Sequence, residues 1–115
     1  MTFLQACREG ELVAAQNCTH RVGERNKAFR SACKNGHLEV AQWVYSLGGV
    51  DHHARNEWAF RKACAYCNLE IIQYLLSLTV SEDVIVECLK YKSCQNILQQ
   101  HIRCKKIKSA RSVNL

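Results

Sequence analysis

The feature that most constrains this chain is an internal repeat with a period of 31 residues. The segment AFRSACKNGHLEVAQWVYSLG, which starts at Ala28, aligns with AFRKACAYCNLEIIQYLLSLT, which starts at Ala59. The identical positions are Ala28, Phe29, Arg30, Ala32, Cys33, Leu38, Glu39, Gln42, Ser46 and Leu47, which recur as Ala59, Phe60, Arg61, Ala63, Cys64, Leu69, Glu70, Gln73, Ser77 and Leu78. A period of this length indicates one small structural unit that is used repeatedly, with neighbouring units stacked on one another.

Weaker copies flank this pair on both sides. The stretch TFLQACREGELVAAQ keeps six positions of the repeat at an offset of 26 residues: Phe3, Ala6, Cys7, Gly10, Leu12 and Gln16. Residues 83–102 contain VIVECLKY and NILQQHI, which correspond to the two halves of a fourth copy and place Cys88 at the position of Cys64. We predict units at about 2–27, 28–58, 59–80 and 81–102, followed by a basic C-terminal tail at 103–115.

Each unit is predicted to be a pair of short helices. In the first helix, Phe29, Ala32 and Cys33 follow the i, i+3, i+4 spacing of one helical face, and Asn35-Gly36 supplies a left-handed exit. The second helix, at about 38–47, has only a narrow polar stripe, so its other sides must be covered by neighbours. Stacking in a row provides that cover, which predicts an all-α solenoid of helix-turn-helix units.

The connector GGVDHHARNEW, residues 48–58, is polar and begins with two glycines. We expect it to be too short for another helix and to form a protruding turn or a short, irregular hairpin-like connection. Its tip would then be exposed to solvent.

This sequence resembles an ankyrin repeat array over residues 2 to about 102. The segment ACKNGHLEVAQWVYSLGGVD is similar to the A-A-x-x-G-H-L-E-V-V-x-x-L-L-x-x-G-A-D pattern of the family, and ACREGELVAAQ and ACAYCNLEIIQYLLSL repeat it more weakly. The T-P-L-H opening of the family is absent, since Lys27-Ala28-Phe29-Arg30 stands in its place. This variant looks most like the ankyrin arrays encoded by large DNA viruses of protists. The resemblance implies a non-catalytic protein-protein interaction module, with a host protein as partner if the source is viral.

The binding surface of ankyrin arrays is usually built from the connector tips and the outward face of the first helices. In this sequence, the resemblance assigns that surface to His52, His53, Arg55, Asn56, Glu57 and Trp58 in the connector and to Arg30, Ser31, Lys34, Lys62 and Ala65 in the first helices. Several of these residues are basic, which favours a partner with an acidic surface. The alternative is a face that is merely solvated. Trp58 is open to two interpretations, interface anchor or packing residue, whereas Trp43 is expected in the core.

Composition limits the class of protein. At 115 residues, with 48% hydrophobic and 23% charged residues, the chain is long enough for one small domain. It has no apolar run that could span a membrane, and Arg8, Glu9 and Glu11 argue against a secretory signal at the N-terminus. We therefore expect a monomer in the cytoplasm, that of the host if the source is viral, without membrane contact. Its eight cysteines would be reduced thiols there.

Cys64 and Cys67 have the C-x-x-C spacing, for which zinc binding and dithiol redox chemistry are the alternatives to packing. Cys64 occupies the position of Cys7 and Cys33, so the repeat indicates a packing residue. Cys67 occupies the position that Gly36 has in the preceding copy of the repeat, where a glycine with positive φ is favoured. A second C-x-x-C or a paired histidine motif at a usual ligand spacing is absent from the sequence. We expect neither a metal nor a cofactor.

The net charge of +6 is concentrated in residues 103–111, RCKKIKSAR, which hold five basic residues and no acidic one. Nucleic-acid contact through this tail is the alternative function, although no aromatic residues interleave with the cations to stack on bases. Contact with an anionic membrane, nuclear targeting, and a solvated tail or the end of a terminal helix are the other interpretations. A further alternative is a shortened member of a repeat family, near the minimum of about three units. Because neither a nucleophile motif nor a glycine-rich phosphate loop is present, we predict that the chain is not an enzyme.

Overall fold

The computed structural model describes the backbone of residues 1–113 and the side chains of residues 1–105. All regular structure in residues 1–113 is helical, which confirms the predicted all-α class. The helices are α1 (Phe3–Glu9), α2 (Leu12–Gln16), α3 (Arg25–Lys34), α4 (Leu38–Ser46), α5 (Ala54–Ala65), α6 (Leu69–Leu78), α7 (Glu82–Cys88) and α8 (Gln95–Val113). The short 3-10 turns η1 (Val22–Glu24) and η2 (Lys92–Cys94) lead into α3 and α8.

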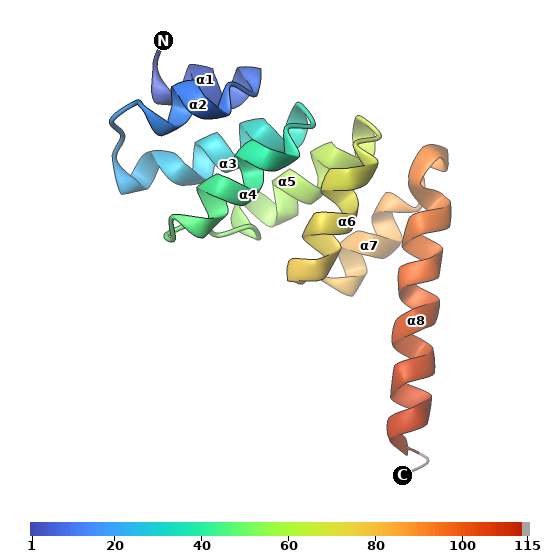
Figure 1. The fold of residues 1–115 in the computed structure, drawn as a ribbon. Coiled ribbons are helices and arrows are strands. Elements are labelled where there is room, and N and C mark those ends of the chain that lie inside the picture. Colours follow the sequence, from blue (N-terminus) through green and yellow to red (C-terminus); the bar gives the residue numbers. More distant parts are fainter. Residues whose placement is uncertain (114–115) are drawn as a thin grey trace.

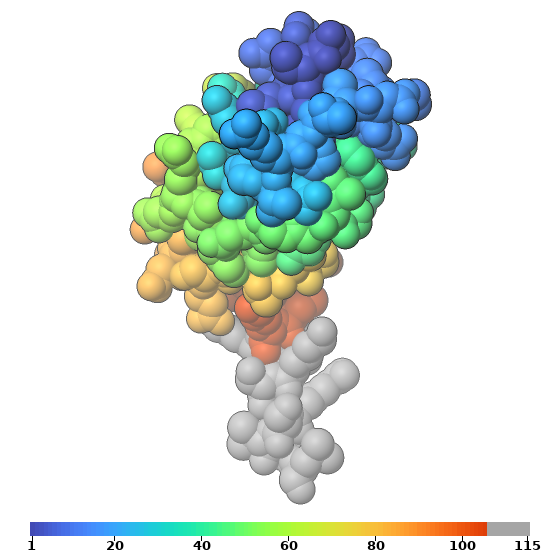
Figure 2. Space-filling model, turned by 90° about the vertical axis from the view of Figure 1, so that its left-hand side faces the viewer, coloured from blue at the N-terminus to red at the C-terminus, as the bar shows by residue number. Residues whose placement is uncertain are grey.

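The helices form pairs that are stacked in the order of the sequence (Figure 1). The first helices α1, α3, α5 and α7 pack on one another in succession, and each also packs on its own second helix, α2, α4, α6 or α8. Viewed from the N-terminal end, the colours follow the sequence from blue at the top to orange below (Figure 2). The molecule is accordingly elongated, with principal extents of 53 × 31 × 22 Å.

The same turn joins the two helices of the first three pairs. The backbone amides of Glu11, His37 and Asn68 donate to the carbonyls of Ala6, Ala32 and Ala63 respectively, in each case at 2.9 Å. The residue before each donor has positive φ, with values of 78° at Gly10, 78° at Gly36 and 58° at Cys67. This is the hydrogen-bond pattern of a helix that ends in a left-handed residue. The predicted equivalence of Cys67 with the two glycines is confirmed.

The two glycines are also places of close approach between neighbouring units. A Cβ at Gly10 would lie 2.5 Å from Nδ1 of His37, and a Cβ at Gly36 would lie 3.0 Å from Oδ1 of Asn68. His37 and Asn68 occupy the same position in successive copies of the repeat. The Cys67 side chain, by contrast, is exposed. A side chain is therefore accommodated at position 67, where only the backbone conformation favours glycine.

The core is built from one face of each first helix and the covered flanks of the second helices. Cys7, Cys33 and Cys64 are buried, as expected for packing residues. Cys88 is buried too, but its position in the repeat is not the predicted one. The buried residues Val84, Ile85 and Cys88 of α7 match Ala59, Phe60 and Ala63 of α5. Cys88 therefore corresponds to Ala63, one residue away from the position of Cys64.

The connector between the second and third pairs differs from the expected hairpin-like connection. No strand forms within residues 1–113, and α5 begins at Ala54. Its first turn is left-handed, with φ of 57°, 57° and 62° at Arg55, Asn56 and Glu57. The connector is held against the preceding pair by Arg25, whose guanidinium donates to the carbonyl of Gly48 at 3.1 Å. Residues 54–57 thus form a left-handed turn that leads directly into the regular part of α5.

The last helix extends beyond the fourth predicted unit. Ile97 and Ile102 of α8 pack against the core, and the helix continues through residue 102 to Val113. Residues 103–113 are therefore the end of α8, and α8 reaches past the neighbouring helices in Figure 1. The side chains of residues 106–115, which include much of the predicted basic tail, lie outside the described residues. None of the described helices is both long and apolar enough to cross a lipid bilayer.

Candidate binding groove

Two cavities adjoin along the face formed by the first helices, and both contain Trp58. The first, which we call the α3 cavity, has a volume of about 370 Å³ and is lined by Arg8, Lys27, Arg30, Ser31, Lys34, Asn35, Arg55 and Trp58. The second, the α7 cavity, has a volume of about 240 Å³ and is lined by Trp58, Arg61, Lys62, Ala65, Glu87, Cys88, Lys90 and Tyr91. We call these two cavities together, with Trp58 common to both, the cationic groove.

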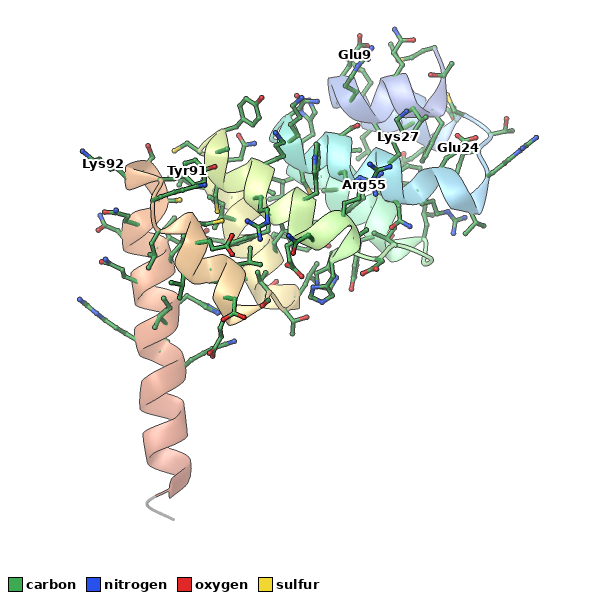
Figure 3. The ribbon with its side chains drawn as sticks, turned by 180° about the vertical axis from the view of Figure 1, so that it is seen from behind. Glu9, Glu24, Lys27, Arg55, Tyr91 and Lys92 are labelled. Carbon is green, nitrogen blue, oxygen red and sulfur yellow. The ribbon has the colours of Figure 1, made fainter. Side chains whose placement is uncertain are left out.

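The α3 cavity has five cationic side chains and no acidic one in its lining. Lys27, Arg30 and Lys34 come from a single face of α3, since their i, i+3 and i+7 spacing places them in line. Arg8 is added from the last turn of α1, and Arg55 from the left-handed turn of α5. Lys27 and Arg55 are labelled close together in Figure 3. Three consecutive units therefore direct positive charge into one cavity.

The α7 cavity is closer to neutral. Arg61 donates a hydrogen bond to a carboxylate oxygen of Glu87 at 2.5 Å, and this bond raises the pKa of Arg61. Arg61 also donates from Nε to the carbonyl of Asn56 at 2.8 Å. Lys62 and Lys90 are the other cations in the lining.

Arg30 occupies the same position of the repeat as Arg61, yet it has no acidic neighbour in the cavity. When the buried residues of α5 and α7 are matched, Glu87 of α7 corresponds to Lys62 of α5. The unit after Arg30 therefore has a cation where the unit after Arg61 has a carboxylate. Burial, and after it the charge of Arg55, lower the pKa of Arg30. The α3 cavity is therefore a site where positive charge is concentrated without compensation.

Trp58 lies where the two cavities meet and is half-buried. The ammonium of Lys62 lies 5.6 Å from the centroid of the Trp58 ring, within the range of a cation–π contact. Trp58 is therefore partly packed and also lines both cavities, and its role as an interface anchor stays a prediction. Trp43 is also half-buried, and its ring packs edge-on against Phe3 with centroids 6.1 Å apart.

The structure brings together seven of the eleven residues assigned by the ankyrin resemblance. Arg30, Ser31, Lys34, Arg55 and Trp58 line the α3 cavity, and Lys62 and Ala65 join Trp58 in the α7 cavity. The remaining four, His52, His53, Asn56 and Glu57, line neither cavity. The groove is thus formed mainly by the helices, with Arg55 and Trp58 as the contribution of the connector.

The two histidines and Glu57 make hydrogen bonds within the protein. His52 bonds through Nε2 to the carbonyl of Thr79 at 2.8 Å, and His53 bonds through Nδ1 to Glu57. Glu57 is only 5% exposed, so the expectation that it contributes to an exposed binding surface is wrong. Its Oε2 atom makes no hydrogen bond within the described residues. The left-handed turn explains the difference, because it redirects the side chain at position 57 into the protein.

Residues of the groove that the sequence did not single out include Arg8, Lys27, Arg61, Lys90 and Tyr91. Two signals were available in the sequence. Arg8 follows Cys7 as Lys34 follows Cys33, and Lys27 lies three residues before Arg30 on one helical face. Lys90 and Tyr91 had no such signal, because the fourth unit departs from the repeat after α7.

The cysteines of the C-x-x-C spacing lie in different environments. Cys64 is buried, whereas Cys67 is exposed, and both are free thiols. A hydrogen bond between the thiols of Cys64 and Cys88 raises the pKa of Cys64 and lowers that of Cys88. Cys94 donates to the carbonyl of Tyr91 at 3.4 Å. Within the described part of the chain, no three or more His, Cys, Asp or Glu side chains are grouped so that they could hold a metal ion.

Comparison with known proteins gives no relative: no protein-family model, no curated protein and no solved structure matches this chain.

Proposed function

We propose that this chain is a non-catalytic protein-binding module of the ankyrin type, with the cationic groove as its binding surface. The order of the helix pairs and the turn repeated after α1, α3 and α5 support the ankyrin-type architecture. The observation that carries the proposal is the α3 cavity, where five cationic side chains from three helices meet without an acidic one.

An acidic segment of a protein partner is the occupant that this groove fits best. Complementary charge accelerates encounter and disfavours partners with the wrong charge. Trp58 offers a half-buried aromatic side chain at the centre of the groove, which is the type of residue that often anchors an interface. An extended segment could contact the cations of the α3 cavity and the ring of Trp58 at the same time.

Capture of partners by a charge-reversed groove tests the proposal. The groove variant would combine Lys34→Glu, Arg55→Glu and Lys62→Glu. The control would combine Arg21→Glu, Arg103→Glu and Lys105→Glu, which are exposed residues outside the two cavities and give the same change in net charge. Wild type, groove variant and control would be immobilised and exposed to a lysate of the natural host, with the bound proteins quantified by mass spectrometry.

The proposal predicts a set of proteins retained by wild type and control and lost from the groove variant. Circular dichroism of the three chains checks that the variants are folded. Identical sets of bound proteins on all three columns would contradict the proposal.

A further inference from the structure

We infer that the α3 cavity binds the phosphate group of a phosphorylated residue in the partner protein. This inference rests on the proposed function, because it names the chemistry by which the cationic groove would recognise that partner. Three features support it: the amount of positive charge in the cavity, the arginines among its cations, and the lysine ammonium groups that lie over the aromatic rings.

The charge of the α3 cavity exceeds what one carboxylate would neutralise. Its five cations have no acidic side chain in the lining. The ion pairs among the described side chains are those of His53 with Glu57 and of Arg61 with Glu87, and neither includes a cation of this cavity. A phosphorylated side chain carries a charge of about −1.5 to −2 and three acceptor oxygens, whereas Asp or Glu carries a single charge. A phosphate is therefore the better match in charge.

The type of cation also favours phosphate. Arg8, Arg30 and Arg55 present guanidinium groups from three different helices. The planar fork of donors in a guanidinium fits two oxygens of a phosphate at once, and hydrogen bonds between charged groups are the stronger ones. The hydroxyl of Ser31 is a further donor in the same lining.

Arg30 is the central residue of this site. It is half-buried, and its burial and the charge of Arg55 both lower its pKa. Both influences disfavour the charged form, and the attraction of a bound anion opposes them. Because attraction between charges is stronger in a partly desolvated site than in water, Arg30 should contribute more to binding than a fully exposed arginine would.

The rings along the groove argue for a protein rather than a single-stranded nucleic acid. Recognition of a nucleic-acid strand uses aromatic faces on which successive bases stack. Here a lysine ammonium lies over the rings of Trp58 and Tyr91, at 5.6 and 5.2 Å from their centroids. The positive charge is also concentrated in the α3 cavity, because in the α7 cavity the carboxylate of Glu87 pairs with Arg61 and neutralises part of the charge.

A set of short degenerate peptides that differ only at the central residue tests the inference. The central residue would be phosphoserine, serine or aspartate, and binding to the full chain would be measured by fluorescence anisotropy. Charge-assisted hydrogen bonds contribute about 1.5–3 kcal/mol, so the phosphoserine peptides should bind about tenfold or more tightly than the serine peptides. Inorganic phosphate should compete with them.

Matched variants locate the effect. Arg30→Gln should reduce binding of the phosphoserine peptides by about tenfold. Arg103→Gln removes the same charge from an exposed position of α8 and should leave binding unchanged. An equal loss in both variants would overturn the assignment to the α3 cavity.

The other outcomes separate this inference from the proposed function. Equal binding of phosphoserine and serine peptides, or no binding of any peptide, would overturn the phosphate inference, while the capture experiment decides the proposed function independently. If a uridine-rich oligonucleotide, or vesicles that contain phosphatidylinositol phosphates, bound more tightly than the phosphoserine peptides, the assignment to a protein phosphate would be overturned.

Discussion

Asn68 bonds to Lys34 across the boundary between two helix pairs. The side-chain amide of Asn68, just before α6, donates to the carbonyl of Lys34 at 2.8 Å and to the carbonyl of Cys33 at 3.1 Å. Both carbonyls belong to the last turn of α3, where a helix has no intrahelical donors for its carbonyl groups. One side chain of the third pair thus caps the first helix of the second pair.

We expect Asn68→Ala to lower the free energy of unfolding by about 1–3 kcal/mol, because two half-buried hydrogen bonds to carbonyls of α3 are lost. Chemical denaturation followed by circular dichroism measures this change. Asn96→Ala, at an exposed position of α8, is the control and should have little effect. Equal stability of Asn68→Ala and wild type would show that the cap contributes nothing.

Position 67 should tolerate glycine better than cysteine. Its φ of 58° lies in the left-handed region, where a residue with a Cβ is disfavoured by about 1 kcal/mol relative to glycine. We expect Cys67→Gly to be neutral or to raise the free energy of unfolding by up to about 1 kcal/mol. Cys67→Ala separates the two contributions, because it removes the thiol and keeps the Cβ. Destabilisation by both variants would mean that the thiol itself has a role.

An alanine should be tolerated less well at position 36 than at position 67. Gly36→Ala introduces a Cβ at a φ of 78° and 3.0 Å from Oδ1 of Asn68, so it strains the backbone and crowds the inter-unit contact. We expect a loss of at least about 1 kcal/mol, measured in the same denaturation series. A cost as small as that of Cys67→Ala would contradict the close approach described above.

The free energy of unfolding should fall as the pH rises above about 8.5. Burial raises the pKa of the Cys7 thiol to about 11 and also raises the pKa of Cys33. A hydrogen bond to Cys88, together with burial, raises the pKa of Cys64. An unfolded thiol ionises near pH 8.5, so above about this pH the unfolded chain releases protons that the folded chain retains. The stabilisation is complete below that pH and is lost as the pH rises towards the folded values.

Urea midpoints measured under reducing conditions between about pH 8 and pH 10 test this prediction. For Cys7 alone, the shift corresponds to a loss of the order of 3 kcal/mol over its full range. Cys7→Ala should flatten the decline, whereas Cys104→Ala, which removes an exposed thiol, should not. A decline that is equally steep in both variants would exclude Cys7 as a cause.

The α3 cavity should make the unliganded protein less stable than it could be. Arg30 lies near Arg55 without an acidic partner, so Arg30→Gln should raise the free energy of unfolding by a few tenths of a kcal/mol while it weakens anion binding. Thermal denaturation at low and high salt measures the effect. Added salt should narrow the difference between Arg30→Gln and wild type, because it screens the repulsion. A lower stability of Arg30→Gln at all salt concentrations would contradict this account.

Much of the helical framework could be predicted because its signals are local. The i, i+3, i+4 spacing of Phe29, Ala32 and Cys33 placed the buried face of α3, and Gly36 placed its end. The fourth pair was harder to predict, because only the packed structure shows that Cys88 corresponds to Ala63. The left-handed turn at residues 55–57 was missed, since the sequence there has none of the glycines that usually mark positive φ.

The sequence by itself determined the helical class, the pairing of helices and the turn that ends α1, α3 and α5, because apolar periodicity and glycine positions act over a few residues. Only the tertiary structure decided how the residues of the candidate site come together. Arg8, Arg30 and Arg55 are far apart in the chain and meet because α1, α3 and α5 stack side by side. The burial of Glu57 likewise depends on the path of the connector. The convergence of charges into a cavity depends on how whole units pack, and no local spacing in the sequence encodes it.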